Sequence, residues 1–186
     1  MSALFQYFDQ FNPLSEAAKV AIQGICTVQK IKKGQDLQPI GHTCRTIYFI
    51  QKGLARIYYF KDDIDITESF ALEHQIIARV ESLFSGKPSR KGIQMLEDSE
   101  VVAINATKLF QLYDRFPDIE RLFRKIFEAG YVETVNRIES LQFHSAEERY
   151  QDLLQHAPSI LQRVPLKRIA SYLGITPVSL SRIRAK

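Results

Sequence analysis

The side chains with the clearest chemistry lie in the last 22 residues, PLKRIASYLGITPVSLSRIRAK, from Pro165 to Lys186. From Pro158 onward the chain holds six of its 25 lysines and arginines and none of its 21 acidic residues, a formal charge of +6 against −2 for the rest. Cationic and hydroxyl groups without carboxylates suit a polyanion, because neutralised phosphates release their counterions. The alternative is a solvated basic segment with no ligand.

This segment has the pattern of two short helices joined by a tight turn. Gly174 would end the first helix, because glycine tolerates a left-handed backbone. Thr176 is a good N-cap, and Pro177 suits the first turn of the second helix, where its missing N–H costs nothing. The buried side chains would be Leu166, Ile169, Ala170, Leu173, either Val178 or Leu180, and Ile183.

A helix, a short turn with glycine and a second helix form the helix-turn-helix arrangement, whose second helix enters the DNA major groove. Arginine can bond guanine bidentately, and serine or threonine can reach base edges or phosphates. A helix pair that packs without DNA is the alternative interpretation. The candidate DNA contacts are Thr176, Pro177, Val178, Ser179, Ser181, Arg182, Arg184 and Lys186 in the second helix, with Lys167 and Arg168 in the first.

The chain before this segment begins with a short helix, predicted from Leu14 to Gly24. After it, the spacing of the apolar residues changes from that of a helix to that of strands. From Cys26 to about Ile104 the chain reads as short strands separated by turns, which predicts an antiparallel sandwich or barrel. The interruption RVESLFSGKPSRKG, 79–92, is either a loop or one helical turn. The predicted strands are CTVQKI, TIYFIQ, LARIYYF, DITESFAL, GIQMLE and EVVAIN.

A long helix follows, starting at Pro117 and Asp118 and running to about residue 143. At about 1.5 Å per residue it would span nearly 40 Å, too long for one small barrel to cover. Its apolar side would pack partly on the barrel and partly on a second copy of the helix, whereas an exposed connecting helix is the alternative. The apolar positions are Ile119, Leu122, Phe123, Ile126, Phe127, Tyr131, Val135, Ile138 and Leu141 or Gln142.

A further helix should begin at Ser145, which forms a capping-box pattern with Glu148, and end near His156. The predicted fold class is therefore α+β: an N-terminal antiparallel β-barrel or jelly roll, a long dimerisation helix and a small C-terminal helical domain. We expect an effector domain over residues 1–116, the dimerisation or linker helix over 117–143 and the DNA-binding domain over 144–186.

Several kinds of site are not expected from this composition. Cys26 and Cys44 lack metal-ligand spacing, and His42, two residues before Cys44, has no spaced histidine partner, so we predict no metal site. No nucleophile motif or phosphate-binding glycine loop points to an enzyme. The N-terminus has no signal-peptide pattern and no window is apolar enough to span a membrane, so we expect a cytoplasmic protein without a membrane partner.

The order of a glycine-punctuated barrel, a long helix and the terminal IASYLGITPVSLSRIR resembles the CRP/FNR transcription regulators over nearly the whole chain. The strings KKGQDL, TIYFIQKGLARIYYF and LEDSEVVAI look like barrel strands of that family's cyclic-nucleotide-binding-type domain. The resemblance implies a homodimer joined along the long helix, an effector pocket between barrel and helix, and a two-fold symmetric double-stranded DNA site.

The resemblance also implies roles for particular residues. Arg182 occupies the family's chief base-reading arginine position, and Thr176 to Ser179 begin the recognition helix. Pro177 and Val178 depart from the family, whose members often carry arginine and glutamate there, so the preferred DNA sequence is not transferable. Because the family's wing hairpin normally follows the recognition helix and no residues follow Lys186 to form it, we expect a motif without a wing.

The family's cyclic-nucleotide cassette is altered here, which leaves the effector or cofactor unknown. The cassette resembles Phe-Gly-Glu-Leu followed by an Arg-Ser or Arg-Ala pair, and this chain has RVESLFSGKPSRKG in its place. Ser89 falls at the phosphate-arginine position and Arg90 one residue later, which in a strand faces the opposite way. The haem and iron–sulfur ligands of other members are not arranged here. The candidate effector residues are Glu81, Ser82, Lys87, Ser89 and Arg90.

Two functions are therefore in competition. The first is a sequence-specific DNA-binding transcription regulator controlled by a small effector. The alternative is a sensor module for a nucleotide-like small molecule whose C-terminal helices bind protein rather than DNA.

Overall fold

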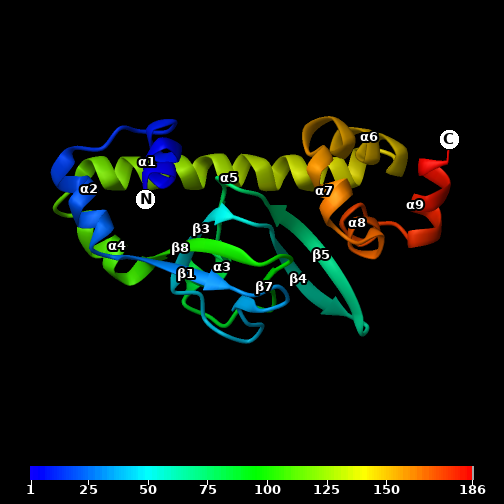
Figure 1. Cartoon of the computed structure of the whole chain (residues 1–186), viewed down its shortest axis with the longest axis horizontal. Helices are drawn as coiled ribbons and strands as arrows, with labels where there is room; N and C mark the ends of the chain where they lie inside the picture. The colour runs from blue at the N-terminus through cyan, green and yellow to red at the C-terminus, as the bar shows by residue number, and fades with distance from the viewer. Residues whose placement is uncertain (186) are drawn as a thin grey trace. The chain divides into compact units, whose positions relative to one another are not determined.

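The computed structural model describes residues 1–185 and divides them into two compact units. The first unit consists of Met1–Ile57 and Phe70–Ala129, and the second of Tyr58–Ser69 and the chain from Gly130 onward. The predicted functional division at residues 116 and 143 does not coincide with these boundaries, and it stays a prediction. Figure 1 labels the helices and all strands except β2 and β6.

The strands form two four-stranded sheets in the orders β1-β8-β3-β6 and β2-β7-β4-β5. The pairs β1·β8, β3·β8, β3·β6 and β2·β7 are antiparallel, which confirms the predicted jelly-roll type of fold. All six predicted strands are present, and β2 and β6 are short additions with weak sequence patterns. The strands are β1 (Cys26–Ile31), β2 (Asp36–Gln38), β3 (Thr46–Lys52), β4 (Ala55–Lys61), β5 (Ile64–Ala71), β6 (Ile76–Ile77), β7 (Gly92–Met95) and β8 (Ser99–Asn105).

After the last strand the described chain contains only helices and their connections, as the helical spacing of its apolar residues predicts. The interruption between strands contains a six-residue helix, α3, and the long helix α5 has the predicted bounds. Helices α1, α4 and α7 were not predicted. The helices are α1 (Ser2–Asp9), α2 (Glu16–Gln23), α3 (Val80–Ser85), α4 (Ala106–Leu112), α5 (Pro117–Phe143), α6 (Ala146–His156), α7 (Pro158–Arg163), α8 (Leu166–Tyr172) and α9 (Pro177–Arg184).

Alternating residues of β3 and β8 enter two different cores of the first unit. Ile47 and Phe49 of β3 face a core shared with helices α1, α2, α4 and α5, whereas Tyr48 and Ile50 face a core between the two sheets. This follows from the two-residue period of a strand, which places neighbours on opposite faces. The residues of α5 that complete the helix-side core are Ile119, Leu122, Phe123 and Ile126, at helical spacing.

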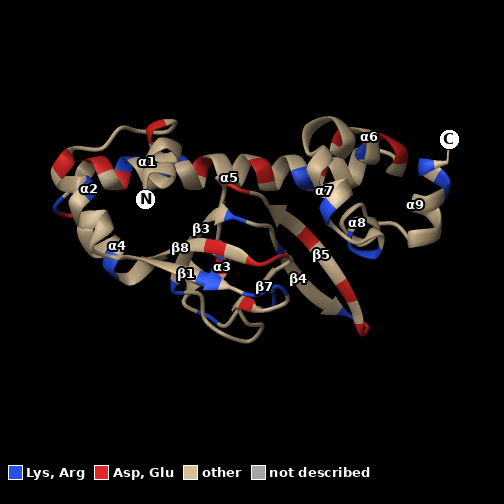
Figure 2. Ribbon diagram, viewed as in Figure 1, with Lys and Arg blue, Asp and Glu red and all other residues tan. Residues whose placement is uncertain are grey.

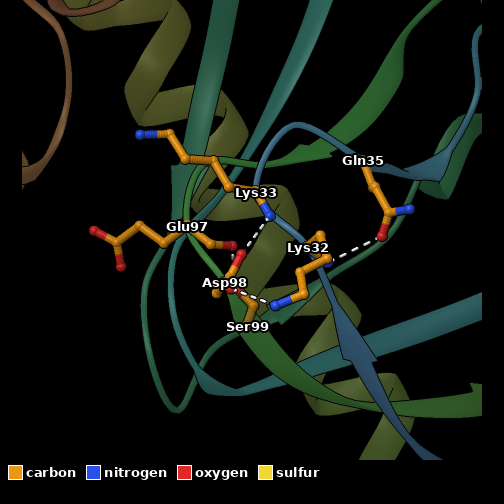
Figure 3. A network of polar contacts seen from close by, with 6 residues as sticks. All are labelled: Lys32, Lys33, Gln35, Glu97, Asp98 and Ser99. Atoms are coloured by element: carbon orange, nitrogen blue, oxygen red, sulfur yellow. Dashed lines mark hydrogen bonds and ion pairs between the residues drawn. The ribbon is translucent and has the colours of Figure 1, made fainter.

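A polar network joins the KKGQDL turn to the LEDSE turn (Figure 3). The Lys32 ammonium lies 2.8 Å from Asp98 Oδ2, and the Lys33 amide donates to Asp98 Oδ1 at 2.9 Å. These two hydrogen bonds hold the pKa of the Asp98 carboxyl below its ordinary value. The Gly34 amide donates to Met95 O at 2.8 Å. Two of the three strings on which the family resemblance of the barrel rests are thus in direct contact.

The second unit has a small core of its own, built by helices α6 to α9. A capping box at Ser145 and Glu148 starts α6, as predicted. The outer part of the β4–β5 hairpin belongs to this unit, and the Thr67 amide donates to Ser171 Oγ of α8 at 3.0 Å. The fully or almost fully buried core side chains are Leu153, Ile160, Val164, Ile169, Ala170, Leu173 and Leu180.

Candidate nucleic-acid interface and effector sites

Helices α8 and α9 are joined by a tight turn at Gly174, as the sequence predicts. Gly174 has a φ of +70°, in the left-handed region that favours glycine, and the Ile175 amide donates back to Ala170 O at 3.0 Å. Thr176 Oγ1 accepts from the Ser179 amide at 3.1 Å and so caps α9, whose first residue is Pro177. The turn and the cap are both local, which is why the sequence could specify them.

The choice between Val178 and Leu180 as the buried residue of α9 is settled by packing. Leu180 is completely buried, with Ile183 partly buried beside it along the helix, whereas Val178 is 62% exposed. Because residues three apart lie on one side of a helix, Leu180 and Ile183 face the core together. The start of α9 therefore presents Pro177 and Val178 to solvent.

The solvent-facing side of α9 carries cationic and hydroxyl groups. Arg182 and Arg184 are exposed. Ser181 is also exposed, but its hydroxyl donates to Pro177 O at 3.0 Å, and the hydroxyls of Ser179 and Thr176 lie 2.9 Å apart. The two arginines thus have the longest reach from this helix, while the hydroxyl groups are held close to the backbone.

Lys167 and Arg168 lie in the first turn of α8, Lys167 exposed and Arg168 half-buried. Figure 2 shows basic residues and no acidic residue along α8 and α9, whereas α6 carries acidic ones. Lys186, the remaining predicted DNA contact, lies outside the described residues. The basic surface of the second unit is therefore concentrated on the two helices that the sequence singles out.

Sequence reasoning missed two arginines that bind the end of α8. Arg137 of α5 donates Nη2 to Tyr172 O, and its guanidinium lies over the Tyr172 ring, 4.0 Å from the centroid. Arg149 of α6 donates Nε to Leu173 O at 3.0 Å. The sequence holds no local signal for these bonds, because the partners are 35 and 24 residues apart.

Two of the five candidate effector residues are engaged inside the first unit. Ser82 Oγ accepts from the Cys44 amide at 2.9 Å and donates to Lys87 O at 2.5 Å. Ser89 Oγ donates to Lys91 O at 2.8 Å. Both serines are buried and hold the segment after α3 in place.

The other three candidate effector residues, Glu81, Lys87 and Arg90, are exposed. Ser89 is buried and Arg90 exposed, but both residues precede β7, so the alternation of a strand does not account for their orientations. Within residues 1–185, none of these three side chains forms a hydrogen bond or ion pair that would hold it against the barrel. They would be free to meet a ligand in solvent.

Two buried arginines near this segment were not anticipated. Arg79 precedes α3 and donates Nε to Ser89 Oγ at 3.4 Å, so a guanidinium lies beside one of the candidate effector residues. Arg56 of β4 is 1% exposed and donates Nε and Nη2 to Gln94 Oε1, at 3.2 and 3.0 Å. Neither could be recognised from the sequence, since arginine in a strand or before a helix is usually exposed.

A hollow of about 340 Å³ lies beside α3 and α4 in the first unit. Its lining includes Leu83 and Gly86 of the α3 segment, but none of the five candidate effector residues. The other lining residues are Thr43, Cys44, Arg45, Ala106, Thr107, Phe110 and Gln111.

The two cysteines are free thiols, and burial raises the pKa of Cys26 to about 11, so this group is protonated at neutral pH. Over residues 1–185, no three histidine, cysteine, aspartate or glutamate side chains come together as a metal site. Within the same range no helix is both long and apolar enough to cross a lipid bilayer.

Residues 28–116 match the family model of the cyclic nucleotide-binding domain. No curated protein matches the chain. Among solved structures, FixK2 from Bradyrhizobium japonicum is similar with a TM-score of 0.74 and 17% identity, over 87% of this chain and 83% of that one.

Two further structures have the same arrangement. A transcriptional regulator from Eubacterium rectale, described as of the CRP/FNR family, has a TM-score of 0.73 and 19% identity over 96% of this chain and 85% of that one. CLP from Xanthomonas campestris, described as a c-di-GMP-responsive global regulator, has a TM-score of 0.71 and 15% identity over 92% and 90%. At these identities the likeness establishes the fold: a cyclic nucleotide-binding jelly roll, a long helix and a small helical domain.

Proposed function

We propose that this protein is a sequence-specific DNA-binding transcription regulator of the CRP/FNR type, acting as a homodimer. The observation that carries the proposal is α9, which is capped by Thr176, set on the left-handed turn at Gly174, and exposes Arg182 and Arg184. No acidic residue occurs from Pro158 onward to oppose a phosphate backbone. A helix of this kind can lie in the major groove with its first turns against base edges.

The exposed groups of the two helices divide by the part of DNA that each can contact. Arg182 has the reach and fork geometry for guanine O6 and N7, while Lys167 and Arg184 suit phosphates. Pro177 and Val178 present an apolar start of α9, and apolar side chains contact the methyl group of thymine. We therefore expect the preferred half-site to contain both a guanine and a thymine.

The homodimer would form through the second half of α5. Tyr131 and Ile138 are exposed and seven residues apart, with the partly buried Val135 between them, which is the spacing of a coiled-coil seam. Large apolar groups on one side of a helix are unfavourable in water and are commonly covered by a symmetric copy. Two copies would present two α9 helices to a two-fold symmetric DNA site. The exposed apolar residues of this half-helix are Tyr131, Val132, Ile138, Leu141 and Phe143.

We further propose that a small effector binds the first unit beside α3. The match of residues 28–116 to the cyclic nucleotide-binding domain supports this. Glu81, Lys87 and Arg90 are the exposed polar groups available to such a ligand, whereas Ser82 and Ser89 would shape the segment through their internal hydrogen bonds.

The test is selection of duplexes from random DNA by the full-length protein, followed by affinity measurements over a range of salt concentrations. We expect one enriched two-fold symmetric motif and an affinity that falls steeply with salt. Arg182→Ala should weaken specific binding by about 1–3 kcal/mol and relax the preference at one base pair. Arg121→Ala, an exposed site in the first half of α5, is the control. Failure to enrich any duplex, or equal affinities for Arg182→Ala and wild type, would overturn the proposal.

A further inference from the structure

A second hollow, of about 210 Å³, lies entirely within the second unit, between the later part of α5, helix α6 and the end of α8. It has room for several water molecules, and so for a small polar ligand. Seven of its eight lining residues have a polar group in the side chain. The lining residues are Glu133, Asn136, Arg137, Ser140, Arg149, Asp152, Tyr172 and Leu173.

Within residues 1–185, the hydrogen bonds of the two guanidinium groups of this hollow all go to neutral acceptors. Arg137 donates one N–H to Tyr172 O, and Arg149 donates to Leu173 O and His144 O. A guanidinium carries five N–H donors. Both arginines therefore keep donors beyond those that bind the backbone carbonyls.

The charges of the two arginines are not neutralised at close range. In the described residues 1–185, no carboxylate oxygen lies within 4.0 Å of either guanidinium. Glu133 and Asp152 line the hollow beyond that distance, and Asp152 lies 2.9 Å from the His156 ring.

The pKa of Arg137 also indicates that its positive charge is not fully balanced by nearby groups. Burial lowers the pKa of Arg137, and the nearby Arg149 lowers it further, while Tyr172 and Glu68 act in the opposite direction. Glu133 and Asp152 line the same hollow, but within residues 1–185 no carboxylate lies within 4.0 Å of either guanidinium, so both cations remain available to one anion. Charge-assisted hydrogen bonds to oxyanions are the strong ones.

We propose that this hollow binds a small soluble oxyanion of the phosphate type. Arg137 and Arg149 would hold it through their remaining N–H groups, with the Asn136 amide and the Ser140 hydroxyl as additional donors. Arginine suits this task because its planar fork matches the spacing of phosphate oxygens. The site is separate from the effector position proposed beside α3 and from the exposed side of α9.

An anion bound here would act on the DNA-reading helix, and this consequence rests on the proposed function. Arg137 and Arg149 bind the last carbonyls of α8, directly before the turn at Gly174 that sets the direction of α9. A ligand that orders both arginines would order the end of α8 and the start of α9. Coupling of this kind is reciprocal, so DNA would also tighten anion binding.

Binding can be measured on the full chain without DNA, which separates this proposal from the proposed function. The unfolding midpoint is followed as inorganic phosphate is titrated, against sodium chloride at matched ionic strength. We expect a saturable rise with phosphate. Ser140→Asp should abolish the rise, because its carboxylate would occupy the hollow while both arginine–carbonyl bonds remain. Gln151→Glu, with the same added charge on an exposed site of α6 outside the hollow, should respond as wild type does.

Two further arms exclude other sources of the effect. A double variant, Arg182→Ala with Arg184→Ala, should keep the phosphate response, because the exposed side of α9 is not the site. With a selected duplex, phosphate at matched ionic strength should raise affinity about fivefold, as for a typical allosteric coupling, in wild type and not in Ser140→Asp. Equal phosphate and chloride responses, or an unchanged response in Ser140→Asp, would overturn the proposal. A lowered DNA affinity would contradict it too, since the hollow would then take a DNA phosphate.

Discussion

At the scale of single residues, Thr176 has two roles: it caps α9, and we propose that it lies at the DNA interface. Its hydroxyl caps α9 by accepting from the Ser179 amide, and it lies at the helix end that would face DNA. Aspartate and asparagine cap helices as well as threonine does. Capping and charge can therefore be varied independently at this position.

We predict that Thr176→Asp keeps the fold but loses DNA binding, whereas Thr176→Asn keeps both. The aspartate would still accept the Ser179 amide, yet its charge would lie against a phosphate backbone. Urea unfolding should give equal stabilities for the two variants within about 0.5 kcal/mol. Fluorescence anisotropy with a selected duplex should separate them by at least about tenfold in dissociation constant. Equal DNA affinities would contradict the placement of Thr176 at the interface.

At the scale of elements, two glycines show how backbone conformation decides the effect of an added methyl group. Gly174 joins α8 to α9 with a φ of +70°, and a Cβ there would lie 3.4 Å from Leu141 Cδ2. Gly130 lies inside α5 in ordinary helical conformation, and in the described part of the chain an added Cβ would meet no atom within 4 Å apart from its chain neighbours and the backbone of its own helix.

We predict opposite signs for alanine at these two positions. Gly174→Ala should destabilise by about 1–2 kcal/mol, because the left-handed conformation is costly for residues with a Cβ. Gly130→Ala should stabilise by about 0.5–1 kcal/mol, because alanine loses less backbone entropy in a helix. Urea unfolding followed by circular dichroism is the measurement. A stabilising Gly174→Ala would rule out the left-handed turn.

The start of α5 contains a carboxylate that links this helix to the chain before α2. Burial alone would raise the pKa of Asp118, but hydrogen bonds from the Ser15 amide, at 2.9 Å, and from the Ile119 amide bring it below the ordinary value of 3.8. Because the folded pKa is lowered, the ionised group stabilises the fold above pH 3.8. This contribution is lost as the pH falls from 3.8 through the folded pKa.

Asp118→Asn should therefore lower the stability of the protein at pH 7 and change it much less below the folded pKa. The comparison is the difference in unfolding midpoint between the variant and wild type, measured from pH 7 down to pH 2.5. Asp114→Asn, a nearby exposed site whose side chain makes no hydrogen bond within residues 1–185, is the control. A difference that is constant over the whole pH range would show that the Asp118 charge contributes nothing.

At the scale of the whole molecule, the proposed regulator depends on association of two copies along α5. Ile138→Glu should weaken the dimer by about 2–4 kcal/mol, because a charge would replace an apolar side chain at the centre of the seam. Glu139→Gln, the next residue on α5, should leave the dimer intact. Sedimentation equilibrium measures the association. A dimer that survives Ile138→Glu would place the interface elsewhere.

The same variant should lose affinity for a two-fold symmetric duplex far more than for an isolated half-site. Linked copies bind the second half-site at a high effective concentration, and a monomer has no such advantage. Competition binding with whole sites and half-sites distinguishes this from a general loss of DNA binding, in which both affinities would fall equally.

Much of the architecture could be predicted because its signals are local. The six longer strands, the bounds of α5, the capping box at Ser145 and the turn at Gly174 all follow from periodicity, capping residues and glycine conformation within a few residues. The short strand β6 and helix α7 were missed, because two to six residues carry too little periodic signal. The candidate interface on α8 and α9 was predictable for the same local reasons.

The sequence by itself therefore determined the six longer strands, the long helix α5, the charge on α8 and α9, and the residues Gly174 and Thr176 that form the turn and cap between those two helices. Only the tertiary structure decided that Leu180 rather than Val178 is buried, that Ser82 and Ser89 are engaged by backbone groups, and that Arg137 and Arg149 meet at the end of α8. The physical reason is distance along the chain. A cap or a turn is fixed by neighbours, whereas burial and the pairing of a guanidinium with a carbonyl depend on segments that only folding brings together.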